Sequence, residues 1–131
     1  MLRQGMAYVE RDRLDQVHFC RARVEGLPFR DTLFVAAICC GSLHLFADTV
    51  RALREIGRTV KSGAPLAVMT FVAGDKGILR FPRIREHVRR DHGAHIFELP
   101  ELEGYLVQAG FEGFRPQTYG SVLVFSARKG G

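Results

Sequence analysis

Phe34-Val-Ala-Ala-Ile-Cys-Cys40 is the stretch that decides the fold, because it is apolar from end to end. A second apolar run spans Leu66–Val72. Runs without polar alternation are typical of strands covered on both faces, as in a parallel sheet. The two runs therefore predict neighbouring buried strands in an α/β domain, joined by whatever lies between them.

The segment between the two runs predicts a helix. Asp48 is suited to its N-cap, and Gly63 and Pro65 follow where a helix should stop. Apolar residues recur at helical spacing along one face; they are Val50, Leu53, Ile56 and Val60. Strand, helix and strand in this order predict a parallel crossover.

The chain ends with a helix and two further strands. Pro100 is suited to the first turn of the helix. The strands predicted at Phe111–Tyr119 and Val122–Ala127 are separated only by Gly120 and Ser121, which indicates an antiparallel hairpin. Pro116 lacks a backbone donor, so its strand should lie at an edge. At the other end of the chain, we expect a helix through Leu2, Met6 and Val9 and a short strand at Val17–Ala22.

Composition sets the general limits. The chain has 131 residues, of which 47% are hydrophobic, and a formal charge of +5, which suits one domain over residues 1–131. No run approaches the ~20 apolar residues that span a bilayer, and no signal peptide is visible, so we expect a cytoplasmic protein without an integral membrane segment. Cys20, Cys39 and Cys40 have no metal-site or disulfide spacing, and we interpret them as small buried residues.

Four segments resemble motifs of the class I S-adenosylmethionine-dependent methyltransferases, especially the ubiquinone/menaquinone-biosynthesis and type 11 groups. The first two are Arg21–Phe29 (RARVEGLPF, similar to R-A-D-x-E-x-L-P-F) and Phe34–Phe46 (FVAAICCGSLHLF, similar to F-D-x-V-x-x-x-x-A-L-H). The others are Ala52–Gly63 (ALREIGRTVKSG, similar to A-L-R-E-x-x-R-V-L-K-P-G-G) and Gln108–Phe111 (QAGF). Four matches in the family's order over nearly the whole chain are specific.

The resemblance implies a truncated Rossmann-like methyltransferase fold. Of the family's sheet order 3-2-1-4-5-7-6, this chain supplies strands 3, 4 and 5, mostly parallel, and the antiparallel hairpin of strands 6 and 7. The glycine-rich turn after strand 1 and the acidic residue after strand 2 are absent, because Met1-Leu2 matches the helix that follows them. We therefore expect the C-terminal portion of a methyltransferase domain, with residues 74–98 as a variable cap on the acceptor side.

The missing strands leave the edge of family strand 4, at Phe34–Cys40, without its usual neighbour. An unpaired apolar edge invites association. Three outcomes are open: strand 3 moves over to pair with strand 4, two chains pair edge to edge as a homodimer, or the missing part exists upstream.

The resemblance implies S-adenosylmethionine as the cofactor. Ala22, Arg23 and Val24 would lie on its adenine side, and Gly41 and Ser42 would contact it after strand 4. Arg23 departs from the family, which has an aspartate there, and a guanidinium cannot accept a hydrogen bond from the adenine amine. An ordinary loop is the alternative interpretation of residues 22–24.

On the acceptor side, His44 is the candidate catalytic base or hydrogen-bonding group, with Leu43 beside it. The alternative is that His44 only packs the following loop. Arg80 and His87, in the cap, are further candidates for contact with a small-molecule methyl acceptor. His87, His92 and His95 match no common metal spacing, so we predict no metal.

Two functions are compatible with these features. The first is methyl transfer from S-adenosylmethionine to a small molecule. The alternative is a non-catalytic methyltransferase-like module that dimerises through the unpaired strand edge. The basic stretch Arg80–Arg90 could bind an anionic acceptor or a membrane surface, but such a run is more often a solvated helix face. No recognised nucleic-acid motif accompanies it, so we predict no nucleic-acid partner.

Overall fold

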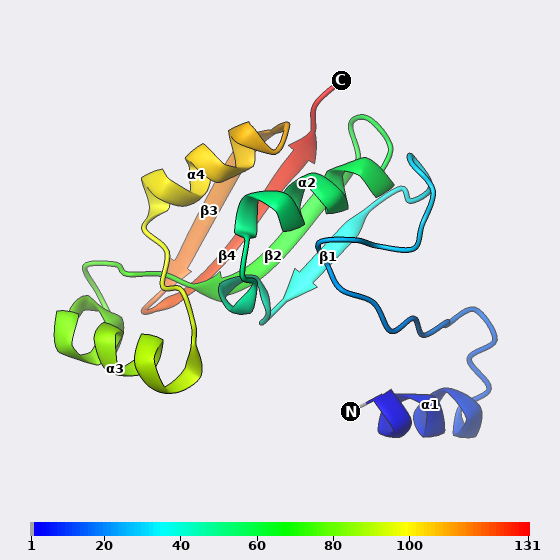
Figure 1. Cartoon of the computed structure of the whole chain (residues 1–131), viewed down its shortest axis with the longest axis horizontal. Coiled ribbons are helices and arrows are strands. Elements are labelled where there is room, and N and C mark those ends of the chain that lie inside the picture. The colour runs from blue at the N-terminus through cyan, green and yellow to red at the C-terminus, as the bar shows by residue number, and fades with distance from the viewer. Residues whose placement is uncertain (1) are drawn as a thin grey trace.

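Four strands form one sheet in the order β1-β2-β4-β3 in the computed structural model, which describes residues 2–131 (Figure 1). The strands are β1 (Ala37–Cys40), β2 (Pro65–Phe71), β3 (Phe111–Tyr119) and β4 (Val122–Lys129). β1 runs parallel to β2, and the other two pairings are antiparallel. The α/β class and the terminal hairpin are confirmed, but the sheet is mixed, because the described residues contain a single parallel pair.

Helix α2 (Thr49–Thr59) makes the predicted crossover from β1 to β2. The side chain of Asp48 accepts a hydrogen bond from the backbone N–H of Arg51 at 2.9 Å, so Asp48 is the predicted N-cap. Leu53 and Ile56 are buried against the sheet. The helix ends at Thr59, and Gly63 adopts a positive φ of 75° in the turn that leads into β2.

Helix α4 (Leu99–Gln108) lies beside α2 on the same face of the sheet (Figure 1). Glu98 and Glu101 form a capping box at its start, which satisfies backbone N–H groups that the first turn leaves unpaired. The chain then turns into β3, which is the edge strand predicted from Pro116. A register shift between Glu112 and Arg115 further interrupts that edge.

The core lies between the sheet and the helices α2 and α4. Laterally paired residues share a face of a sheet, and the row Cys39, Val68 and Phe125 is buried below 10% exposure. The opposite face carries the row Ile38, Ala67 and Ser126, all of them exposed. No helix among the described residues covers this second face, and Ile38 is 81% exposed.

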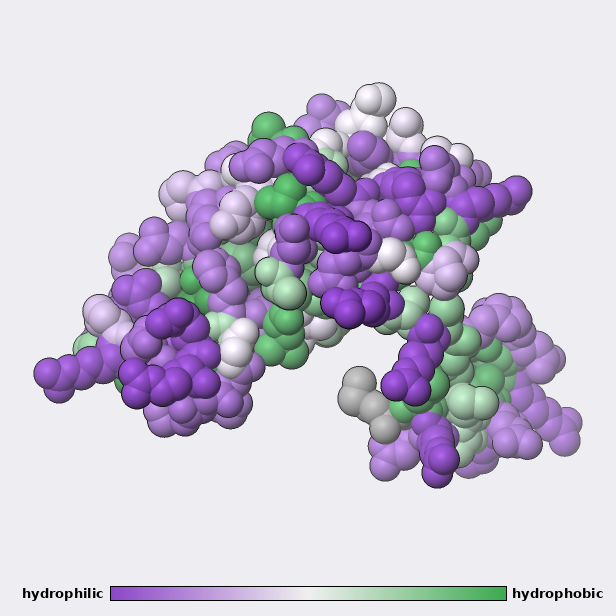
Figure 2. Space-filling view, in the orientation of Figure 1, coloured by the Kyte–Doolittle hydropathy of each residue, from purple (hydrophilic) through white to green (hydrophobic). Residues whose placement is uncertain are grey.

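Helix α1 (Leu2–Arg11) projects away from the sheet (Figure 1), and none of its residues is buried. Figure 2 shows it as a separate lobe with apolar as well as polar surface. The predicted helix is confirmed, except that Met1 lies outside the described residues. The strand predicted at Val17–Ala22 is wrong: these residues are irregular, because no strand of the described chain lies beside them to supply hydrogen bonds.

β1 is consequently an edge strand, with β2 on one side and no strand of the described residues on the other. The outcome in which family strand 3 moves over to pair with it does not occur. The interpretation of the cysteines also needs correction. Only Cys39 is buried; Cys40 points to the uncovered face, and Cys20 lies in the irregular segment, so both are exposed.

The segment at 74–98 contains a short 3-10 helix, η2 (Ile78–Arg80), and helix α3 (Pro82–His92). α3 has no buried residue and lies beyond one end of the sheet (Figure 1). The segment rejoins the body through a bridge between Val72 and Phe97. Its role as an acceptor-side cap stays a prediction. None of the described helices has the length and apolar character needed to cross a membrane.

Candidate functional site

The loop that follows β1 is the centre of the candidate site. β1 and β2 are parallel, so both carboxyl ends lie at one edge of the sheet, where ligands bind in open α/β folds. Gly41 turns the chain there with a φ of 68°, and its N–H donates to the carbonyl of Met69 at 2.9 Å. The one-turn 3-10 helix η1 (Leu43–Leu45) follows. Gly41 and Ser42, both half-buried, thus stand at the predicted position after the strand.

His44 points into the protein from this loop and is only 7% exposed. Its Nδ1 lies 3.3 Å from the hydroxyl of Thr70, and its ring packs edge-on against Phe71. Burial lowers the pKa of His44 below its ordinary value, because the charged imidazolium is poorly solvated there. Leu43 is fully buried beside it. The acceptor-side roles predicted for Leu43 and His44 stay predictions, and the geometry equally serves the packing of the loop.

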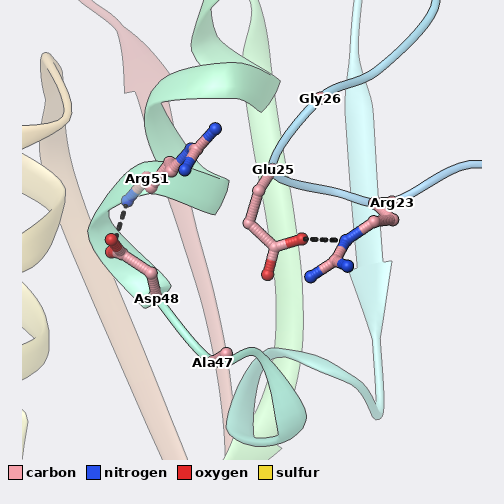
Figure 3. A pocket seen from close by; sticks show the side chains of 6 residues that line it. All are labelled: Arg23, Glu25, Gly26, Ala47, Asp48 and Arg51. Atoms are coloured by element: carbon pink, nitrogen blue, oxygen red, sulfur yellow. Dashed lines mark hydrogen bonds and ion pairs between the residues drawn. The ribbon is translucent and has the colours of Figure 1, made fainter.

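Ala22, Arg23 and Val24 lie in the loop that leads toward β1. The backbone of Arg23 is bridged to that of Gly26. The Arg23 side chain is 88% exposed, and its Nε lies 3.8 Å from a carboxylate oxygen of Glu25. Figure 3 shows this Arg23–Glu25 ion pair on one side of a hollow of about 410 Å³, with Asp48 and Arg51 at the start of α2 on the other side. The hollow is lined by Arg23, Glu25, Gly26, Ala47, Asp48 and Arg51. The structure thus brings Arg23 close to the segment that follows η1.

A second hollow, of about 400 Å³, lies along β1. It includes Val24 and Ser42 from the predicted cofactor set, together with Leu27, Phe34 and Ile38. Its lining contains no charged side chain. An apolar surface of this kind suits a flat ring and does not suit an ammonium or a carboxylate group.

These residues fit one end of S-adenosylmethionine and not the other. The apolar hollow along β1 can accommodate the adenine ring. Arg23 offers donors only, so it cannot bind the adenine amine. A charged methionine end would need paired polar groups, and the lining of the β1 hollow offers chiefly apolar side chains. The lining of the β1 hollow therefore does not account for the whole cofactor.

The cap residues predicted on the acceptor side lie elsewhere. Arg80 stacks on the ring of Phe81 with 4.6 Å from its guanidinium carbon to the ring centroid. His87 pairs with Asp91 at 3.3 Å on α3, and it lines a hollow of α3 with Arg83 and Arg90. Within residues 2–131, no hydrogen bond or ion pair joins Arg80 or His87 to the loop after β1. Their contact with an acceptor therefore stays a prediction.

One cluster of titratable side chains was not predicted from the sequence. His95 Nε2 and the hydroxyl of Tyr105 each lie 2.9 Å from the same oxygen of Glu101. The backbone N–H of His95 also donates to the carbonyl of His44 at 2.7 Å, which ties the cluster to the loop after β1. Sequence spacing gave no signal, because His95 reaches Glu101 only after the chain turns into α4. No group of three or more potential metal ligands occurs within residues 2–131.

Comparison with known proteins agrees with this architecture. A family model described as a methyltransferase domain matches residues 1–68, just over half of the chain. A ubiquinone/menaquinone biosynthesis C-methyltransferase of Pectobacterium atrosepticum is 26% identical over 121 residues, which cover 76% of this chain and 47% of that protein. A tRNA U34 carboxymethyltransferase of Syntrophotalea carbinolica is 32% identical over 107 residues, covering 79% of this chain and 32% of that protein.

Solved structures share the fold. An S-adenosylmethionine-dependent methyltransferase of Thermotoga maritima superposes with a TM-score of 0.74 at 23% identity, covering 92% of this chain and 68% of that one. Phosphoethanolamine N-methyltransferase 2 of Haemonchus contortus, solved with S-adenosylhomocysteine, superposes with a TM-score of 0.80 at 11% identity. That superposition covers 95% of this chain and 40% of the Haemonchus chain. The chain spans about half the length of the first curated relative. Sequence and fold together show that this chain belongs to the class I S-adenosylmethionine-dependent methyltransferases.

Proposed function

We propose that the protein transfers a methyl group from S-adenosylmethionine to a small-molecule acceptor, and that these residues form the acceptor-side part of its catalytic domain. The family match over residues 1–68 carries the proposal. The loop after β1 supports it, because its half-buried Gly41 and Ser42 lie at the ligand-binding edge of the sheet. The apolar hollow along β1 adds a surface for the adenine ring.

The role of the protein in such a reaction would be to hold and orient the two reactants, which can supply much of the rate enhancement. The cofactor, when bound, supplies the activated methyl group. The chain's own contribution would be the loop Gly41–Phe46 near the reacting groups and the cap at 74–98 over the acceptor. A cytoplasmic location and the absence of a nucleic-acid partner belong to the same proposal.

Calorimetric titration of S-adenosylhomocysteine into the purified chain tests this function. The β1 hollow fits only one end of the cofactor, so saturable binding with one site per chain would show that the loops described above complete the cofactor site. Ser42→Trp, which fills the β1 hollow, should abolish that binding, whereas Arg90→Gln at an exposed position of α3 should leave it unchanged. Absence of binding at millimolar ligand would contradict activity of this chain and favour the second candidate.

The second candidate is a non-catalytic module that forms a homodimer through β1. The observation that favours it is the free edge of β1 next to exposed Val35 and Ile38, at 71% and 81% exposure. Such an edge is a template for pairing with another chain. Light scattering after size exclusion should show a dimer that Ile38→Lys converts to a monomer. A monomer at high concentration for the unaltered chain would argue against this candidate.

A further inference from the structure

Two titratable side chains, those of His95 and Tyr105, meet at the carboxylate of Glu101 near the start of α4. Oε1 of Glu101 accepts hydrogen bonds from Tyr105 and from His95, each at 2.9 Å, when the His95 proton is on Nε2. Oε2 accepts from the backbone N–H of Glu98 at 3.2 Å in the capping box. Burial raises the pKa of Glu101, but these three hydrogen bonds together lower it below its ordinary value. The carboxylate is therefore both ionised and fixed in place.

The same contacts fix the ring of His95. Its backbone is held by the carbonyl of His44 at 2.7 Å, and its ring packs edge-on against Phe97 with centroids 4.7 Å apart. An ionised carboxylate can only accept a hydrogen bond, so it keeps a proton on Nε2 of His95. Nδ1 of the neutral ring is then a hydrogen-bond acceptor. The side chain is nevertheless 47% exposed, so a ligand can reach it.

His95 and Tyr105 line a hollow of about 320 Å³ between the start of α2 and α4. Phe46, Val50 and Thr49 supply its other walls. Asp48 contributes a carboxylate, while the lining includes no lysine or arginine. With a second carboxylate, Glu101, hydrogen-bonded to both His95 and Tyr105, an anion would be repelled. The surroundings favour a neutral ligand with an apolar body and a hydroxyl group.

We propose that His95 accepts a hydrogen bond, and then the proton, from a neutral hydroxyl-bearing methyl acceptor in this hollow, with Glu101 as its positioning residue. The proposal rests on the proposed function, because the oxygen that loses its proton is the one that would accept the methyl group. When the O–H bond breaks, its electron pair stays on the acceptor oxygen and the proton forms a bond to Nδ1. The imidazolium that results is stabilised by the adjacent carboxylate of Glu101.

His44 and His87, the two other histidines considered for the acceptor side, lack this combination. His44 is 7% exposed and its Nδ1 faces Thr70. His87 pairs with Asp91 on its own helix and lies on the exposed side of α3. His95 alone of these three is held by a carboxylate of another element and open to a hollow beside the loop after β1.

Ligand titrations followed by NMR test the site without requiring catalysis. Phenol is the probe, and anisole, which has a similar body but no hydroxyl proton, is its matched control. Phenol should shift the ring signals of His95 and the amides of Thr49 and Val50 with an affinity about threefold to tenfold higher than that of anisole, as one net hydrogen bond provides. In His95→Phe this preference should vanish, while His18→Gln should retain it.

Nitrogen chemical shifts of the imidazole ring test the positioning role. The unaltered chain should show His95 with its proton on Nε2. Glu101→Gln should give a mixture of tautomers, because an amide can both donate and accept, whereas Tyr105→Phe should keep the single tautomer. Equal affinity for phenol and anisole, or no saturable shift with either, would overturn the proposal. A chain that prefers phenol over anisole but does not bind S-adenosylhomocysteine would count against the proposed function. The hydroxyl-binding site at His95 would still stand.

Discussion

The two faces of the sheet contrast sharply although their strands are the same. On one face, Val68, Leu123 and Phe125 are packed under α2 and α4 and are almost inaccessible. On the other, Ile38 and Val124 are 81% and 39% exposed, and no described helix covers them. Strand formation therefore depends on pattern and pairing, but coverage depends on which other segments are present. The contrast shows that an apolar run predicts a strand more securely than it predicts two buried faces.

The largest expected effect comes from adjacent residues of β4 that lie on opposite faces. Phe125→Ala should lower the free energy of unfolding by about 3–5 kcal/mol, because it leaves a cavity among packed side chains. Val124→Ala should cost less than about 1 kcal/mol, as substitutions on open surfaces usually do. Urea unfolding followed by circular dichroism measures both. A comparable loss for the two variants would break the comparison, since it would mean that the second face is covered in solution.

Neighbouring cysteines sharpen the same contrast within β1. Cys40, on the open face, should react with a thiol reagent in the native protein, as should the exposed Cys20. Cys39 should react only when the protein unfolds, because it is buried and burial raises the pKa of its thiol. Mass spectrometry of the labelled chain would give two modifications without urea and three with it. Rapid labelling of Cys39 in the native protein would show that β1 opens readily.

A smaller effect is expected from the ion pair between Glu55 and Arg58 on α2. The hydrogen bond from Arg58 is the main reason that the pKa of Glu55 is lowered. A carboxyl group with a lowered pKa in the folded state stabilises the fold above its unfolded pKa of about 4.3. That contribution is lost as the pH falls below this value and through the folded pKa. Urea unfolding between pH 6 and about pH 3 measures this contribution. The free energy of unfolding should fall less with decreasing pH in Glu55→Gln than in the unaltered chain. An identical pH dependence in the two proteins would contradict a stabilising role of the Glu55 carboxylate.

Much of the covered half of the molecule could be predicted from the sequence. Asp48 and the apolar stripe of α2 are local signals, and so are Pro100 in the first turn of α4 and the short turn at Gly120. The strand expected at Val17–Ala22 failed because a strand needs a neighbour, and that neighbour is not among the described residues. The local sequence pattern does not indicate whether a neighbouring strand is available for pairing.

The candidate site was predictable only in part. The loop Gly41–His44 was located from its motif and lies where it was expected, after a parallel strand. The burial of His44 depends on Thr70 and Phe71 of the adjacent strand, which no spacing reveals. His95 became visible only when the fold brought it to Glu101 and to the carbonyl of His44. The environments of His44 and His95 are set by contacts between elements, which residue types and their spacing do not reveal.

The two outer edges of the sheet differ in their capacity to pair with a further strand. Pro116 and the register shift after Glu112 disable the outer edge of β3, while the outer edge of β1 has neither device. In a dimer formed through β1, the β1 edge of each molecule would be paired. The β3 edges, which are poorly suited to pairing, would lie at the two outer ends of the combined sheet. Such an assembly would close at two members by symmetry, so pairing through β1 would not extend into a fibre.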